Sequence, residues 1–104
     1  MGTYIALLRF EMDPAAGAAT KLQDAADLLE RYVKQQEASG LEVRASYLTL
    51  GVHDALIVME APGDKEVARL TASSSTLRPR IRTEVLRGFT REQCNAFLPG
   101  GGSR

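Results

Sequence analysis

The residues best suited to chemistry are His53 and Asp54, which follow Gly51 between two predicted strands. An imidazole exchanges protons near neutral pH, so His53 is a candidate general acid or base. Adjacent residues on a strand point to opposite faces, so His53 and Asp54 form a dyad only if the turn distorts the backbone. The structural alternative is that Gly51 permits the turn and Asp54 hydrogen-bonds its backbone.

A second candidate pair is Arg82 and Glu84, which lie two residues apart and therefore share one face of a predicted strand. They could bind a polar ligand, with Arg82 orienting a carboxylate or enolate. The alternative is an ion pair in water, which contributes at most about 1 kcal/mol. Arg9, on the first strand, needs a partner if it is buried, and Glu60 is a candidate. It could equally extend into solvent at the strand end, beside Glu11.

Tyr47 is expected at the core or at an interface, with its hydroxyl at the rim. The candidate catalytic residues are therefore His53, Arg82 and Glu84. The candidate ligand-binding residues are Arg9, Tyr47, His53, Asp54 and Arg82.

The composition excludes several other chemistries. Thirteen Lys and Arg balance thirteen Asp and Glu in 104 residues, so we expect no nucleic-acid or membrane partner. A single histidine and a single cysteine, Cys94, cannot form a zinc cluster, and no metal and no cofactor, haem included, is expected. The apolar run at residues 4–8 is too short for a signal peptide or a membrane span. The pattern favours a soluble cytoplasmic protein, in keeping with an unpaired thiol.

Two helices are expected to position these residues, and a third follows them. The longest begins near Thr20 and Gln23, which have capping-box spacing, and ends at Gly40. Its apolar stripe is Leu22, Ala25, Ala26, Leu29, Tyr32 and Val33. A shorter helix has Asp64 as its N-cap. Its predicted buried face is Val67, Ala68, Leu70 and Thr71. Helix formation is expected to weaken at residues 73–75 and to be blocked at Pro79.

Four strands are expected, over residues 3–10, 43–49, 55–59 and 80–89. The first and third are apolar on both faces, as in central strands. The second is predicted to be a half-buried outer strand with one face formed by Val43, Ala45, Tyr47 and Thr49. After the fourth, Thr90 and Gln93 repeat the capping-box spacing and begin a short helix through Phe97.

The order strand, helix, strand, strand, helix, strand predicts an α+β, ferredoxin-like βαββαβ fold, with a four-stranded antiparallel sheet and both helices on one face. Because the central strands are apolar on both sides, the open face is expected to be covered. We expect a second copy of the chain to cover it, forming a homodimer. The alternative is that the C-terminal helix folds back, packing Cys94, Phe97 and Leu98 onto the domain.

Several segments, in order over about residues 3 to 92, resemble the GYD domain family: residues 4–10, 47–51, 54–55, 60–62, 82–87 and 89–90. Gly51 and Asp54 match the Gly, Tyr, Asp signature, and His53 stands where the tyrosine is usual. The resemblance implies one GYD-like domain over residues 1–98 and membership of the dimeric α/β-barrel superfamily. The glycine-rich tail over 99–104 has nothing to bury and is expected to be flexible. That superfamily includes cofactor-free monooxygenases, isomerases, dehydratases, haem enzymes and ligand-sensing domains.

The leading functional hypothesis is a homodimeric GYD-domain protein of unassigned activity that binds a small organic ligand in a pocket of the α/β barrel. The alternative is a cofactor-free monooxygenase- or isomerase-like enzyme of that superfamily. A third hypothesis is a structural assembly subunit without a ligand-sized cavity.

Overall fold

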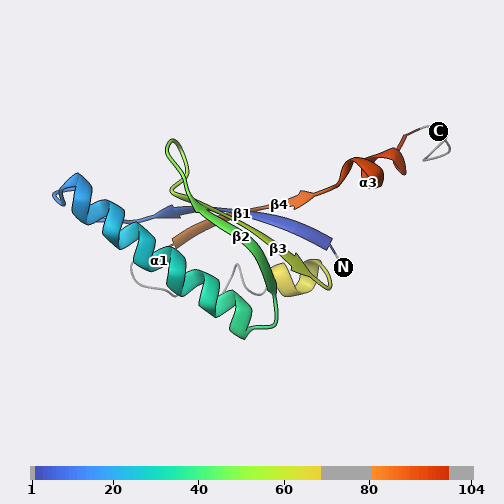
Figure 1. Cartoon of the computed structure of the whole chain (residues 1–104), viewed down its shortest axis with the longest axis horizontal. Helices are drawn as coiled ribbons and strands as arrows, with labels where there is room; N and C mark the ends of the chain where they lie inside the picture. The colour runs from blue at the N-terminus through green and yellow to red at the C-terminus, as the bar shows by residue number, and fades with distance from the viewer. Residues whose placement is uncertain (1, 69–80, 99–104) are drawn as a thin grey trace.

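The computed structural model describes residues 2–68 and 81–98. Within them the elements follow the predicted order and end in a short helix (Figure 1). The elements are β1 (Gly2–Phe10), α1 (Ala18–Ala38), β2 (Glu42–Leu48), β3 (Ala55–Ala61), a helical segment at residues 64–68, β4 (Ile81–Gly88) and α3 (Arg91–Asn95).

The four strands form one antiparallel sheet in the order β2-β3-β1-β4. This is the ferredoxin-like arrangement predicted from the sequence. The two strands that are apolar on both faces, β1 and β3, form the central pair, with Gly2 opposite Ala61 and Leu8 opposite Ala55. A central strand has both edges paired and neighbours on both sides, so this position suits the most apolar segments.

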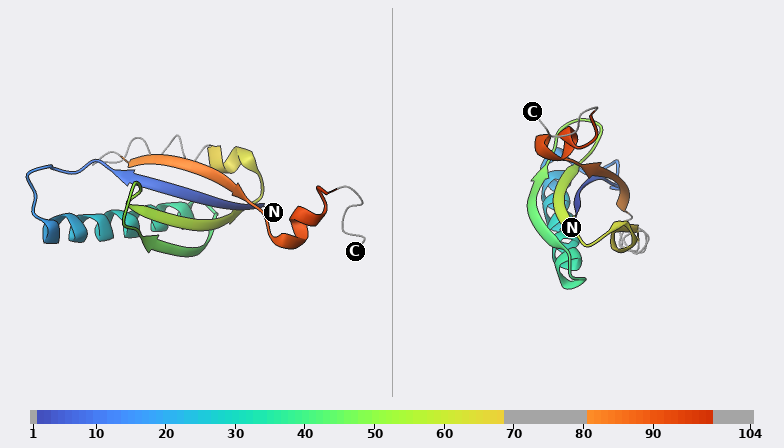
Figure 2. Two further views of the ribbon diagram at one scale, coloured as in Figure 1. Left: turned by 90° about the horizontal axis from the view of Figure 1, so that it is seen from above. Right: turned by 90° about the vertical axis from the view of Figure 1, so that its right-hand side faces the viewer.

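The core lies between the sheet and α1. Alternate residues of β1 and β3 point to this side, and they are buried: Tyr4, Ala6, Leu8, Phe10, Ala55, Ile57, Met59 and Ala61. The helix α1 contributes Ala25, Leu28, Leu29 and Tyr32. Val67 of the helical segment joins the same core cluster, so both helices serve one face (Figure 2).

The two ends of α1 differ from each other in how well the sequence predicted them. Gly40 adopts φ +93°, its amide donates to Glu37, and the amide of Leu41 donates to Gln36. This double hydrogen bond is the Schellman ending expected from a glycine. The predicted capping box at Thr20 is wrong, because the N-cap is Gly17 and no side chain caps it. The Gln23 side chain donates instead to Asp27, at 3.2 Å.

The predicted apolar stripe of α1 is also partly wrong. Leu28 is buried although it was outside the predicted stripe, whereas Leu22 is 61% exposed. The helix extends past the end of the sheet, so its first turns have less sheet beneath them (Figure 2). Ala25, Leu29 and Tyr32 are buried as predicted.

Strand β2 contains a β-bulge that the alternating pattern did not reveal. Val43 pairs with Met59 and Ala45 pairs with Val58, which leaves Arg44 as the extra residue. A bulge reverses which side chains share a face. Val43 therefore points to the covered face and Tyr47, opposite Leu56, points to the open one, so the predicted shared face of these two residues is wrong.

The short C-terminal helix α3 has its predicted capping box, since Thr90 accepts from the Gln93 amide and the Gln93 side chain accepts from the Thr90 amide. Its predicted packing is wrong. Cys94, Phe97 and Leu98 are exposed, because α3 projects beyond the end of the sheet (Figure 1). Phe97 stacks edge-on against Phe89, with ring centroids 5.2 Å apart.

The predicted second helix lies only partly within the described residues. Residues 64–68 are helical, so Asp64 lies in the first turn and not at the N-cap. Val67 is buried as predicted and Ala68 is exposed. The predictions for Leu70, Thr71, residues 73–75, Pro79 and the tail 99–104 fall outside the described residues.

Candidate functional site

The open face of the sheet brings together two of the candidate catalytic residues. His53, in the loop between β2 and β3, reaches across β1 to Glu84 of β4, and its Nε2 lies 3.2 Å from Oε2 of that carboxylate. The imidazole is 27% exposed, so it is partly sheltered and still accessible to a small molecule. A carboxylate that holds one ring nitrogen orients the imidazole, which is useful for proton transfer.

Asp54 does not join this pair. Its carboxylate accepts from the Phe10 amide at 2.8 Å, its amide donates to Leu8, and its carbonyl accepts from Thr49. The loop itself is held by the Thr49 hydroxyl, which donates to the His53 carbonyl at 2.6 Å. Gly51 adopts φ +127°, the conformation that the structural alternative required. Asp54 therefore anchors the hairpin to the end of β1.

Arg82 and Glu84 share the open face but make separate contacts. Arg82 Nε lies 3.6 Å from Oε1 of Glu11, and both side chains are largely exposed. Arg9 pairs with Arg82 across the strands and is exposed as well. Arg9, Glu11 and Arg82 therefore form a solvent-exposed polar cluster near the His53–Glu84 pair.

The suggested contact between Arg9 and Glu60 is absent, because Glu60 lies opposite Thr3 at the other end of β1. Glu60 binds Arg44 instead, with Nη2 2.8 Å from Oε2. Glu42 and Glu60 face each other across β2 and β3, and the bulged Arg44 approaches both carboxylates. The bulge thus relieves a like-charge pair. The Arg44 hydrogen bond holds the pKa of Glu60 below its usual range and raises the pKa of Arg44.

Tyr47 is 59% exposed on β2 and opposes Leu56. It lies on the open face with apolar neighbours that are only half-buried or exposed: Ile5, Leu7, Leu56, Val58 and Leu86. Both α1 and the helical segment at residues 64–68 contribute their buried side chains to the core on the other face of the sheet. The open face is therefore an apolar surface bordered by charged residues.

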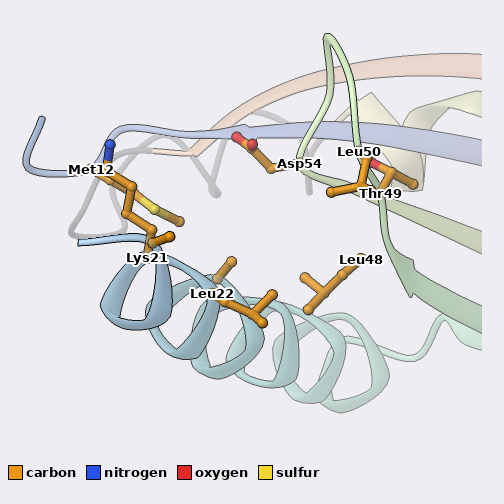
Figure 3. A pocket seen from close by; sticks show the side chains of 9 residues that line it. Met12, Lys21, Leu22, Leu48, Thr49, Leu50 and Asp54 are labelled. Atoms are coloured by element: carbon orange, nitrogen blue, oxygen red, sulfur yellow. The ribbon is translucent and has the colours of Figure 1, made fainter. Parts of the chain in front are cut away.

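The structure adds a groove that sequence reasoning missed. It lies between the start of α1 and the β2–β3 loop and has a volume of about 590 Å³. Figure 3 shows Leu22 facing Leu48 across it, with Lys21 near Met12 at the end where α1 begins. Its lining residues are Met12, Ala18, Lys21, Leu22, Ala25, Leu48, Thr49, Leu50 and Asp54.

Only Asp54 among the sequence candidates lines this groove. The available signal was the pairing of an apolar Leu22 with a basic Lys21 in the first turn of α1. Because the predicted apolar stripe placed Leu22 in the core, Leu22 was not expected to line a groove.

A second cluster lies at the opposite end of the covered face. The Tyr4 hydroxyl donates to Asp64, and Arg87 lies 3.6 Å from the same carboxylate. The Arg87 guanidinium also stacks over the Tyr4 ring, 5.1 Å from its centroid. The hydrogen bond to Asp64 raises the pKa of the Tyr4 phenol. These contacts join β1, β4 and the helical segment, and we interpret them as structural.

Within residues 2–68 and 81–98, no three His, Cys, Asp or Glu side chains are grouped so as to hold a metal ion. No helix in these described parts is both long and apolar enough to span a membrane.

The strand order and the packing of the described helices on one face of the sheet define an α+β protein of the ferredoxin-like class. Within that class the chain belongs to the GYD domain family, whose model matches residues 4–98. No curated protein sequence matches the chain.

Solved structures share the fold at low sequence identity. FFRP-DM1 has a TM-score of 0.58 at 16% identity, over 86% of this chain and 100% of that one. TTHA0845 from Thermus thermophilus has a TM-score of 0.59 at 18% identity, over 86% and 95%. The hypothetical protein PHS023 from Pyrococcus horikoshii has a TM-score of 0.58 at 18% identity, over 88% and 93%. Identities this low support the fold alone.

Proposed function

We propose that this GYD-domain protein is a homodimeric ligand-binding module, in which each copy holds a small organic molecule in the groove beside α1. The observation that carries the proposal is the apolar groove of about 590 Å³ between α1 and the β2–β3 loop. Sites for small molecules have roughly 300–1,000 Å³ and mostly apolar walls with a few polar groups. The groove fits both criteria, since Lys21, Thr49 and Asp54 are the polar side chains among the described residues that line it.

The dimer is supported by the open face. Its apolar side chains, such as Leu7, Val58 and Leu86, lie on the two central strands and on β4. A contiguous apolar patch on a sheet is costly to leave in water and favours a protein interface. The helix α3, which was the intramolecular candidate for covering it, projects away from the sheet (Figure 2). We further propose a cytoplasmic location, on the basis of the unpaired Cys94.

Two matched substitutions separate the groove from the interface. Leu22→Glu places a charge in the groove, and Leu86→Glu places the same charge on the open face, where the leucine is 45% exposed. Because both leucines are partly exposed, both variants should fold. Sedimentation velocity would report the dimer, and methyl NMR shifts of Leu48 would report binding of 2-naphthoate and 2-naphthalenemethanol as probes.

We expect Leu86→Glu to dissociate the dimer and to leave probe binding intact. Leu22→Glu should have the reverse effect and weaken the probes by at least about tenfold, since an unpaired charge opposes an apolar ligand. A wild-type monomer would overturn the dimer. Failure of both probes to shift Leu48 would overturn the ligand-binding role.

The His53–Glu84 contact favours a second candidate, a cofactor-free enzyme of the monooxygenase or isomerase type. A carboxylate-oriented imidazole on an apolar surface could remove an acidic C–H proton from an enolisable substrate. Such an enzyme would accelerate deuterium exchange at the methylene of anthrone, which NMR can follow in deuterated buffer. His53→Gln and Glu84→Gln should each remove the acceleration, and wild-type exchange at the buffer rate would count against this candidate.

A further inference from the structure

We propose that the groove beside α1 selects an amphipathic organic anion, whose charged head lies at Lys21 and whose apolar body lies between Leu22 and Leu48. This inference rests on the proposed ligand-binding role and adds the chemical class of the ligand. Nothing in the His53–Glu84 pair is required for it, because that pair lies on the open face and does not line the groove.

The apolar part of the ligand is specified by the walls. Leu22 of α1 faces Leu48 of β2, and Met12 lies at the end near the β1–α1 connection (Figure 3). Ala25 of α1 also lines the groove. Leu22 is the most exposed large apolar residue of the helix, in a position where its neighbours Ala25 and Leu29 are buried. A ligand that inserts here removes this side chain from water without any change in the fold, which is the hydrophobic contribution to binding.

The charge of the head group follows from Lys21. Among the described residues it is the only cationic side chain that lines the groove, and it is half-buried. Within the described residues no carboxylate forms an ion pair with Lys21, whereas Lys34 on the same helix pairs with Glu30 at 3.0 Å. A half-buried ammonium without an ion-pair partner favours an anionic group beside it.

Two features of the surroundings strengthen the preference for an anion. Lys21 lies in the first turn of α1, which has no acidic residue and no side-chain cap. The partial positive charge at the N-terminus of this helix is therefore not neutralised by a nearby side chain. Asp54, the one acid among the described residues that line the groove, already accepts a hydrogen bond from the Phe10 amide at 2.8 Å. That bond partly satisfies its charge and holds it at the β1 side of the groove.

Three probes with the same two-ring body test the charge preference: 2-naphthoate, 2-naphthalenemethanol and 2-naphthylmethylammonium. Dissociation constants would be measured at pH 7 by NMR titration of the Leu48 methyls in the full-length chain. We expect naphthoate to bind at least about tenfold more tightly than the alcohol, as one charge-assisted contact in a half-buried site provides.

The assignment to Lys21 is tested with matched lysine variants. Lys21→Met keeps most of the apolar stem and should abolish the preference for naphthoate, and Lys21→Arg should retain it. The control is Lys65→Met, an exposed lysine in the helical segment at the other end of the sheet, which should change nothing. A preference that persists in Lys21→Met would overturn the role of Lys21.

The outcomes also separate this inference from the proposed function. Equal binding of naphthoate and the alcohol would overturn the anion preference while the ligand-binding role stands. Tighter binding of the ammonium probe would overturn it in favour of a cation held by Asp54. If none of the three shifts Leu48, the ligand-binding role fails and this inference fails with it.

Discussion

On the face of the sheet covered by α1, Leu8 of β1 is fully buried, whereas its neighbour Leu7 lies half-buried on the open face. The same contrast runs along β3, where Ile57 is fully buried and Val58 is not. The side chains on the two faces are chemically alike, so composition does not distinguish them. What differs is the cover: α1 and the helical segment supply it on one side, and no described element supplies it on the other. The chain therefore carries apolar surface beyond the needs of its own core.

The largest expected effect is the difference in stability between truncating Leu8 and truncating its neighbour Leu7. Leu8→Ala should reduce the free energy of unfolding by about 2–5 kcal/mol, because it leaves a cavity in the core. Leu7→Ala should cost much less in the isolated chain and should weaken the dimer instead. Urea unfolding at low and high protein concentration measures both effects. Equal losses at low concentration would mean that the open face is covered within one chain.

A smaller effect, on the pH dependence of stability, is expected at Tyr4 on the covered face. The pKa of its phenol is raised chiefly by its hydrogen bond to Asp64. Because the pKa in the folded chain exceeds that in the unfolded chain, the stabilisation is complete below about pH 10 and is lost as pH rises through the folded value. Asp64→Asn should lower the pKa of Tyr4 towards its usual value. Titration of ¹³C-labelled tyrosine measures this, and an unchanged Tyr4 titration would contradict the assigned cause.

A weaker pH dependence is expected on the open face, at Glu60. Arg44 holds the pKa of this carboxyl below its usual range, so the stabilisation is present above the unfolded pKa, near 4.5, and is lost as pH falls through the folded value. The difference in melting temperature between the wild type and Glu60→Gln should therefore be larger at pH 7 than at pH 3. A constant difference would show that the charge of Glu60 is not the cause. Glu37→Gln, on the exposed side of α1, is the control.

The smallest effect on stability is expected for substitutions in the C-terminal helix α3. Because α3 packs on neither face, Phe97→Ala should leave the free energy of unfolding unchanged within about 0.5 kcal/mol. Cys94 should react with Ellman's reagent in the native protein, as an exposed thiol does. Protection of Cys94 in dilute protein, together with a destabilising Phe97→Ala, would restore α3 as the cover of the open face.

The sequence carried most of the fold because the signals for it are local. The apolar runs in residues 3–10 and 55–59 and the Gly40 ending depend only on nearby residues, and all correspond to observed features. The predictions that failed needed information from elsewhere in the chain. Thr20 and Gln23 have the right spacing for a capping box, but α1 begins before them, at Ala18, and the capping role is lost.

In the candidate site, too, the sequence predicted what depends on single residues and missed what depends on distant parts of the chain. The residue types named from the sequence were sufficient to select His53 and Glu84, but not to pair them with each other. Their contact depends on how β1 and β4 are aligned and on how the β2–β3 loop turns over the open face. Arg82 was expected beside Glu84, and the same alignment leaves it near Glu11. Register across strands is a property of the whole sheet, so spacing along one strand cannot supply it.

By itself, then, the amino-acid sequence determined the order of the elements, the central position of β1 and β3, the family and the excess of apolar surface. Periodicity, glycine conformation and hydrophobicity are properties of short segments, and they persist wherever the segment lies. Only the tertiary structure decided that Arg44 forms a bulge, that Leu22 borders a groove beside Lys21, and that His53 meets Glu84. Each of these joins segments that are distant in the chain, and their meeting depends on the twist, length and register of the elements between them.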